Sequence, residues 1–173
     1  NTWPSTVTVI PGVVIASPES IEATGALGGY GDAAAVLRIL VPGTGSTTVN
    51  VSAIPEDGSI APSGSELTVE GGVVTDVPLG DFAEGTWTFT VTSEKPVVAA
   101  ARTSTVTLAA DPATSVDSGV DPVVVSTDFA WFVGTPELAG TALVSVAKGP
   151  SPLLHLANTG SADAAVTIDA SEG

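Results

Sequence analysis

The chain has 173 residues, with 19 acidic and 4 basic side chains and a formal net charge of −15. Because this negative net charge repels phosphate backbones and anionic lipid surfaces, we expect neither nucleic acid nor a membrane surface as a partner. The sequence contains no cysteine, which excludes disulfides, thiolate metal sites and cysteine nucleophiles. No apolar run reaches the about 20 residues that a membrane-spanning helix needs.

The composition favours strands. Valine, threonine and isoleucine suit a pleated, half-buried surface because their branched Cβ is restricted in a helix. The 19 glycines and 13 prolines are typical of many short strands joined by turns. Alternating apolar runs predict strands, and no window keeps a helical period. The predicted strands are residues 6–10, 13–16, 36–41, 47–54, 65–69, 73–78, 86–93, 97–107, 123–126, 130–133, 143–147, 153–158 and 164–170.

The first glycine-rich run of chemical interest is "LVPGTGSTTVNVS", residues 40–52. A phosphate-binding loop of this type needs a lysine after its last glycine and a helix whose N-terminus faces the anion. Ser46 stands where that lysine would be, and a strand is predicted to follow. The run therefore predicts a turn and no nucleotide site. Further along, "TWTFTV" puts Trp87 and Phe89 on one strand face, which we expect to lie in the core.

The chain repeats one pattern. "VLRILVPGTGSTTVNVSA", residues 36–53, aligns without a gap on "LLHLANTGSADAAVTIDA", residues 153–170, which indicates duplicated units. Between them, "LAADPATSVDSGVDPVV" has the proline, glycine and serine content of a linker. We therefore predict an all-β, antiparallel, immunoglobulin-like β-sandwich that is duplicated, with a partial second copy. The predicted boundaries are 1–107 for the first unit, 108–122 for the linker and 123–173 for the second unit. The alternative is that residues 123–173 pack onto the first unit.

Four sequence segments follow one another along the chain: "VLRILVPG", "TTVNVSAIPEDG", "LTVEGGVVTDVPL" and "TFTVTSEKPVVAAAR". With "DFAWFVGTPELAGTALVSVAKG" after them, the chain resembles a domain of unknown function from actinobacterial secreted or membrane-anchored envelope proteins. The resemblance spans residues 6–172 and consists of apolar alternation and turn residues. It implies an exported β-sandwich protein of the cell envelope, outside the cytoplasm, whose anchor lies outside this sequence. It carries no functional residue over.

Two clusters are candidates for a site. Phe129 and Trp131 share one face of a predicted strand and Phe132 points to the other, so at least one ring is exposed or lies at an interface. Exposed rings stack on sugars, and core packing is the alternative. The second cluster is acidic and would bind calcium through oxygen ligands, although the EF-hand spacing is missing. It comprises Asp111, Asp117 and Asp121 in the linker, with Glu56 and Asp57 at a hairpin.

The only histidine, His155, lies between Leu154 and Leu156, and we expect it on the outward face opposite these leucines, in an exposed structural role. With one histidine, no multi-histidine metal site can form. The sequence therefore favours a non-catalytic structural or protein-interaction module that needs no cofactor. Its partner would be an envelope protein or a neighbouring copy of itself. The alternative is a carbohydrate-binding module that uses the segment around Trp131, and a hydrolase built on two carboxylates comes third.

Overall fold

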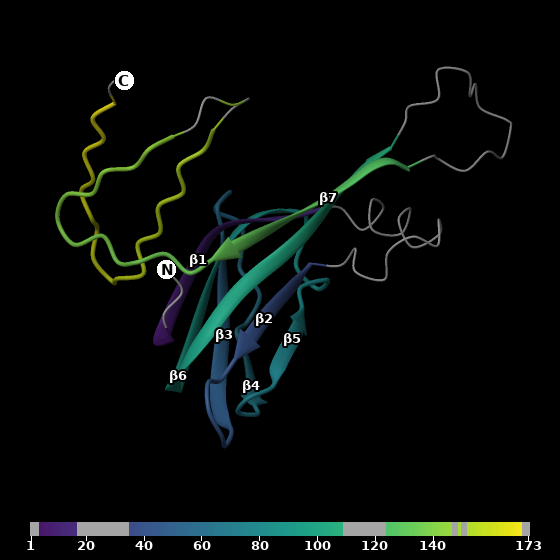
Figure 1. The fold of residues 1–173 in the computed structure, drawn as a ribbon. Coiled ribbons are helices and arrows are strands. Elements are labelled where there is room, and N and C mark those ends of the chain that lie inside the picture. Colours follow the sequence, from purple (N-terminus) through teal and green to yellow (C-terminus); the bar gives the residue numbers. More distant parts are fainter. Residues whose placement is uncertain (1–3, 17–34, 109–123, 147–148, 150–151, 171–173) are drawn as a thin grey trace, which may run out of the picture.

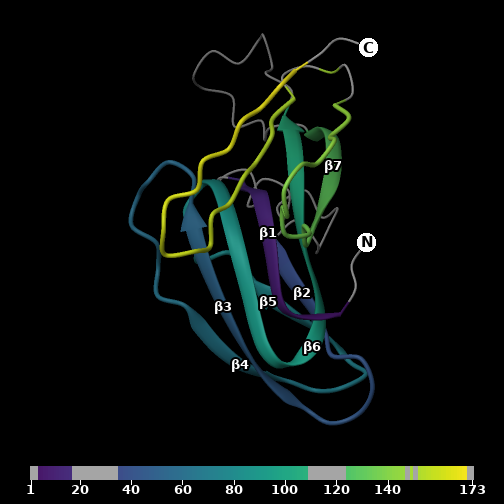
Figure 2. The same cartoon turned by 90° about the vertical axis from the view of Figure 1, so that its left-hand side faces the viewer.

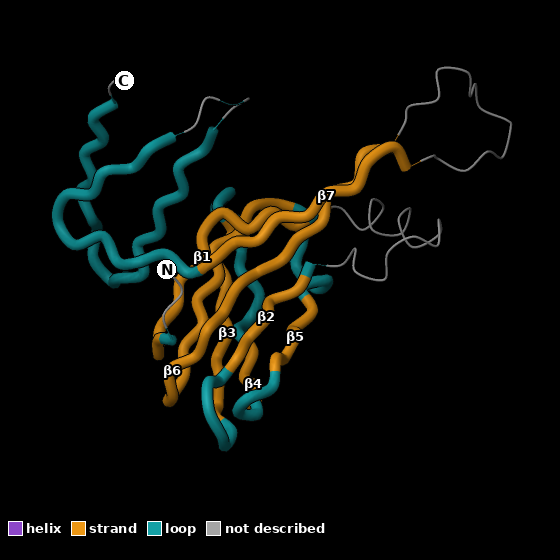
Figure 3. The backbone as a smooth tube through the Cα atoms, viewed as in Figure 1, coloured by secondary structure: helices purple, strands orange, loops and turns teal. Residues whose placement is uncertain are grey.

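The computed structural model describes residues 4–16, 35–108, 124–146, 149 and 152–170, without the side chains of residues 105–108 and 124–127. These parts of the chain contain seven strands and no helix (Figures 1 and 3). A helix that could span a membrane is therefore not found among the described residues. The all-β fold class that the sequence predicts is confirmed. The strands are β1 (Ser5–Ile15), β2 (Val36–Leu40), β3 (Thr47–Pro55), β4 (Ser65–Val69), β5 (Val74–Pro78), β6 (Gly85–Leu108) and β7 (Val124–Val133).

The seven strands form one curled antiparallel sheet with β6 running through it. The first half of β6 lies between β1 and β3, with β4 beyond β3. Its second half lies between β2 and β7, with β5 beyond β2. Because β6 joins both halves, its bend brings one face of each half onto a shared core (Figure 2).

The predicted strands 86–93 and 97–107 are one strand, although Pro96 lies between them. Proline cannot donate to a ladder, so it is tolerated where no ladder bond is needed. Pro96 meets this condition, because the pairing of β6 with β3 ends at Ser93 and its pairing with β2 begins at Val98. The two predicted strands of β1 are likewise continuous, with a bulge between Ile10 and Val13 where Pro11 and Gly12 are inserted.

The core draws its side chains from both halves of the sheet. Trp87 and Phe89 are buried in it, as their alternation predicts. Phe82 closes over both rings, with edge-to-face contacts at centroid distances of 5.3 Å to Trp87 and 5.0 Å to Phe89. The other fully buried large side chains are Ile10, Val13, Leu37, Ile39, Val41, Val49, Val69, Leu79, Val91 and Val97.

The loop after β2 turns the chain, as predicted. Gly43 and Gly45 have φ angles of +89° and +80°, which glycine adopts without a steric penalty. No helix follows: β3 starts at Thr47. The loop instead packs on the turn between β4 and β5, where the Gly72 amide donates to the Val41 carbonyl at 2.9 Å.

Beyond Thr135, which pairs with Val9, the described residues form no strand (green to yellow in Figure 2). The predictions of strands at 143–147, 153–158 and 164–170 are therefore wrong for their described residues. Alternation gives a strand only where a neighbouring strand completes the ladder. Residues 36–40 have β5 and β6 as such neighbours, whereas residues 153–157 have no ladder partner among the described residues.

β7 extends the half of the sheet that contains β2, by pairing with β6 from Ala100 to Leu108. Residues 126–133 of the predicted second unit therefore pair with residues 100–107 of β6, in the predicted first unit. Of the predicted linker, Leu108 is the last residue of β6. Residues 109–122, including Asp111, Asp117 and Asp121, lie outside the described residues.

Candidate functional site

The alternation of β7 separates its three aromatic residues between two faces. The Phe132 ring packs against the hydrophobic core, whereas Phe129 and Trp131 are 63% and 44% exposed on the opposite face. The register of β7 against β6 causes this split, because Ala101 in the core faces Phe132, and Arg102 faces Trp131. The predicted division of the three rings between two faces therefore holds.

A charged pair lies on the same outer face as Trp131. Arg38 of β2 is directly opposite Asp76 of β5, and its Nε and Nη2 atoms donate to the two carboxylate oxygens at 2.7 Å each. The Arg38 guanidinium also lies over the Trp131 ring, 5.4 Å from the ring centroid. This stacking is attractive because the negative face of the ring meets a cation.

We call this surface the aromatic face and define it by Arg38, Asp76, Phe129, Trp131 and Val133. Its side chains come from β2, β5 and β7, and all are at least partly exposed. The hydrogen bonds from Arg38 have the largest effect on the pKa of Asp76 and lower it. Burial opposes them, and the positive charges of Arg38 and Arg102 lower the pKa further by smaller amounts. Asp76 therefore stays ionised at neutral pH and holds the guanidinium in a fixed plane.

The sequence pointed to Trp131 and Phe129 but missed Arg38 and Asp76 as members of the same surface. Alternation does place Arg38 opposite the buried Leu37 and Ile39. What the sequence lacks is the register, which pairs Arg38 with Asp76 and puts both beside β7 across β6.

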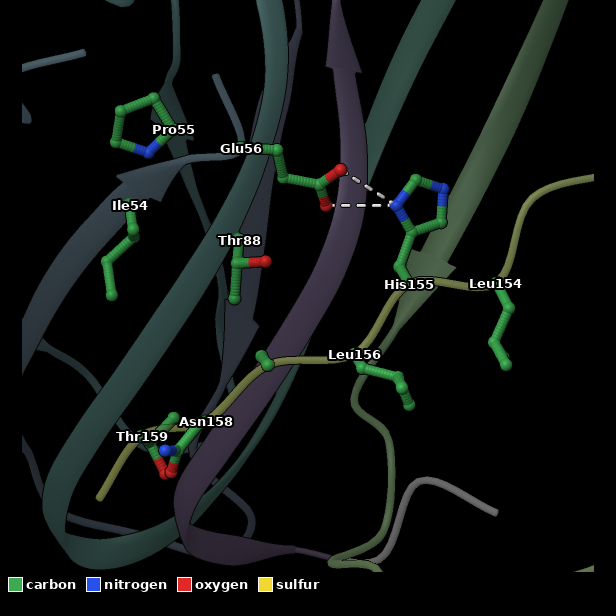
Figure 4. A pocket seen from close by; sticks show the side chains of 10 residues that line it. Ile54, Pro55, Glu56, Thr88, Leu154, His155, Leu156, Asn158 and Thr159 are labelled. Atoms are coloured by element: carbon green, nitrogen blue, oxygen red, sulfur yellow. Dashed lines mark hydrogen bonds and ion pairs between the residues drawn. The ribbon is translucent and has the colours of Figure 1, made fainter. Parts of the chain in front are cut away.

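A second candidate is the pocket between the end of β3 and residues 154–159, with a volume of about 450 Å³ (Figure 4). In it the Nδ1 atom of His155 lies 2.9 Å and 3.0 Å from the two carboxylate oxygens of Glu56. Ile54, Pro55 and Thr88 form the wall on the side of the sheet.

His155 is turned inward, so the prediction of an outward histidine is wrong. Its ring lies so close over Gly12 that a Cβ on this glycine would be 2.6 Å from His155 Cδ2. Leu154 and Leu156 are about half exposed, the reverse of the expected arrangement. The physical reason is the bulge in β1: Gly12, with φ +75° and no side chain, leaves room for the imidazole beside Glu56.

The pocket contains one carboxylate and one imidazole, which hold residues 154–159 against the sheet. Among the described residues no three histidine, aspartate or glutamate side chains are grouped to hold a metal ion. The Asp57 carboxylate accepts a hydrogen bond from the Ser59 amide at 2.8 Å. Hydrogen bonding from the backbone and the side chain of Ser59 lowers the pKa of Asp57. Glu56 and Asp57 therefore each have a partner in the structure.

Comparison with known proteins gives a family and a shared fold. A family of unknown function, DUF5719, matches residues 1–173. The chain belongs to DUF5719. No curated protein matches it. Among solved structures, protein 1070 of Thermotoga maritima aligns with a TM-score of 0.51 and 14% identity, over 78% of this chain and 96% of that one.

The sensory rhodopsin transducer of Anabaena aligns with a TM-score of 0.42 and 18% identity, over 58% of this chain and 90% of that one. At 14% identity, the Thermotoga protein shows that the DUF5719 chain shares its fold and nothing further. DUF5719 is a family of unknown function, so only the geometry of this chain indicates a site. Of the two candidates, the aromatic face alone presents exposed aromatic rings, and the guanidinium of a charged pair lies over one of them, Trp131.

Proposed function

We propose that this DUF5719 chain is a non-catalytic interaction module of an exported cell-envelope protein, and that the aromatic face is its contact surface. One observation carries the proposal: Trp131 and Phe129 are exposed on the same sheet face as an Arg38 guanidinium that is fixed by two hydrogen bonds. Aromatic and arginine side chains dominate the energetics of binding surfaces because they bury much area at a low entropic cost.

The setting in the proposal follows from the sequence. The resemblance to actinobacterial secreted proteins and the net charge of −15 support an exported, highly soluble module. The two halves of the sheet around one core support an immunoglobulin-like description, and the match between residues 36–53 and 153–170 supports an origin by duplication. Its partner in this proposal is an envelope protein or a neighbouring copy of the chain.

Capture from envelope extracts tests the proposal. Immobilised wild-type protein is expected to retain a defined component that Trp131→Ala fails to retain. Ile60→Ala is the matched control, because Ile60 is 96% exposed and belongs to a different part of the chain. Equal retention by all three proteins, with unchanged circular dichroism, would remove the aromatic face as the contact surface.

Carbohydrate binding is the second candidate, and the exposure of Trp131 favours it. A buried ring would have supported a purely structural role, whereas an accessible ring offers an apolar plate to the C–H face of a sugar. A hydrolase that uses two carboxylates is a third proposal. Calcium at Asp111, Asp117 and Asp121 stays a proposal too, and a calorimetric titration without heat at millimolar calcium would remove it.

A further inference from the structure

Three kinds of group meet on the aromatic face. Two exposed rings, Phe129 and Trp131, come from β7, a carboxylate comes from Asp76 and a guanidinium comes from Arg38. We infer that the aromatic face binds an uncharged glycan chain, with the rings as stacking plates and the Arg38–Asp76 pair as the hydroxyl-binding element. This inference rests on the second candidate function, carbohydrate binding without catalysis, and names the chemical class of the carbohydrate.

The rings suit an extended ligand because of their spacing. Phe129 and Trp131 are two residues apart on one strand face, so they are separated by about 6.6 Å along β7. Neighbouring sugar rings of a chain that runs along β7 can therefore each cover one aromatic ring. Sugar rings present apolar C–H faces that stack on aromatic rings. The Arg38 guanidinium lies over one face of the Trp131 ring, so a sugar stacks on the other face of this ring and on Phe129.

The polar element suits hydroxyl groups. A hydroxyl both donates and accepts hydrogen bonds, whereas an ionised carboxylate only accepts and a guanidinium only donates. Asp76 and Arg38 therefore offer complementary partners to two adjacent hydroxyls of one sugar. Their side chains are 41% and 40% exposed, so a ligand can reach both. Because the pair already holds a bidentate geometry, little side-chain entropy is lost when the sugar binds.

The charge distribution selects an uncharged ligand. Arg38 and Arg102 are two of the four basic residues in the whole chain, and Asp76 lies within the influence of both. The named charges of this part of the surface are thus two guanidinium groups and one carboxylate, whereas the chain as a whole carries −15. An extended glycan with a carboxylate on each sugar reaches beyond these three groups to the acidic remainder of the surface, whose charges repel it within a Debye length of about 8 Å.

Calorimetric titration of the full 173-residue chain tests the inference. The probes are cellohexaose, mannohexaose and chitohexaose as uncharged glycans, and hexagalacturonic acid as the anionic one. We expect at least one uncharged probe to bind, and hexagalacturonic acid to bind about tenfold more weakly or not at all. Trp131→Ala should weaken the binding by about tenfold or more, since ring stacking is lost. Asp76→Asn should weaken it several-fold, and Ile60→Ala should leave it unchanged.

Each other outcome overturns the inference in a recognisable way. Equal binding by the anionic probe would refute the selection of an uncharged ligand, and binding that survives Trp131→Ala would move the site elsewhere. If no probe binds but the capture of an envelope protein still depends on Trp131, the glycan is wrong and the interaction module stands. If neither binding nor capture depends on Trp131, both fall.

Discussion

Arg38 and Asp76 face each other across β2 and β5 and are joined by two hydrogen bonds of 2.7 Å. The ion pair between β2 and β5 holds the Arg38 guanidinium over the Trp131 ring of β7. A contact between two strands therefore sets the position of a side chain that contacts a third strand. Removing the carboxylate should therefore alter the surface more than the stability, because solvent screens partly exposed pairs.

The first prediction concerns the pH dependence of this pair. The pKa of Asp76 is lowered from 3.8 in the folded chain, so its contribution to stability is present above about pH 4 and is lost as the pH falls through the folded value. With both side chains two-fifths exposed, we expect Asp76→Asn to cost less than about 1 kcal/mol at pH 7. Urea unfolding at pH 7 and pH 3 checks it: the difference between wild type and variant should shrink at the lower pH. A constant difference would contradict it.

The second prediction separates the faces of β7. Phe132→Ala should reduce the free energy of unfolding by about 2–4 kcal/mol, because it leaves a void beside the core. Trp131→Ala should cost about 1 kcal/mol or less, since its ring is on the exposed face. Chemical denaturation of the two variants measures both values, and a larger loss for Trp131→Ala would reverse the assignment of the faces.

The third prediction tests the packing of the His155 imidazole on Gly12. Gly12→Ala should destabilise the chain beyond the about 1–2 kcal/mol of a left-handed alanine, because its Cβ would collide with the imidazole. Gly43→Ala is the matched control: Gly43 has φ +89° and no atom within 4 Å of a Cβ.

In a His155→Ala background, the excess cost of Gly12→Ala should disappear, which the double-mutant cycle measures directly. An excess that persists without the imidazole would show that the bulge in β1 has another constraint.

The fourth prediction concerns the turn between β4 and β5. A Cβ on Gly71 would lie 2.5 Å from the Gly45 carbonyl oxygen and 2.9 Å from that of Gly43. Backbone atoms cannot move aside as a flexible side chain can, so Gly71→Ala should cost about 2 kcal/mol or more. Gly80→Ala, where no atom lies within 4 Å, should be nearly neutral in the same thermal denaturation series. A neutral Gly71→Ala would mean that this packing contributes little.

Local pattern was enough for most of the sheet. The alternation around Val49 and Val51 predicted β3 to within one residue of its end, because every second side chain of this strand is buried and apolar residues occupy most of these positions. Proline misled the prediction at Pro11 and Pro96, since a bulge and a change of ladder partner accommodate residues that cannot donate.

The candidate site was only half predictable. Trp131 could be found because aromatic residues are few and those of residues 129–132 alternate between two faces, whereas its contact with Arg38 depends on which strands are neighbours. The same limit explains residues 153–158, whose alternation matches that of β2 although they have no ladder among the described residues. Alternation predicts which side chains share a face of a strand, but it does not predict which strands pair with it.

The most direct test of the aromatic face as the contact surface is site-specific photo-crosslinking. A benzophenone-bearing phenylalanine replaces Phe129, which is 63% exposed, and in a second protein it replaces the 96% exposed Ile60. Benzophenone inserts into C–H bonds of proteins and glycans alike, so the experiment does not presuppose the partner. The account predicts a discrete crosslinked product from position 129 in envelope extracts and none from position 60. Equal products from both positions, or none from position 129, would contradict it.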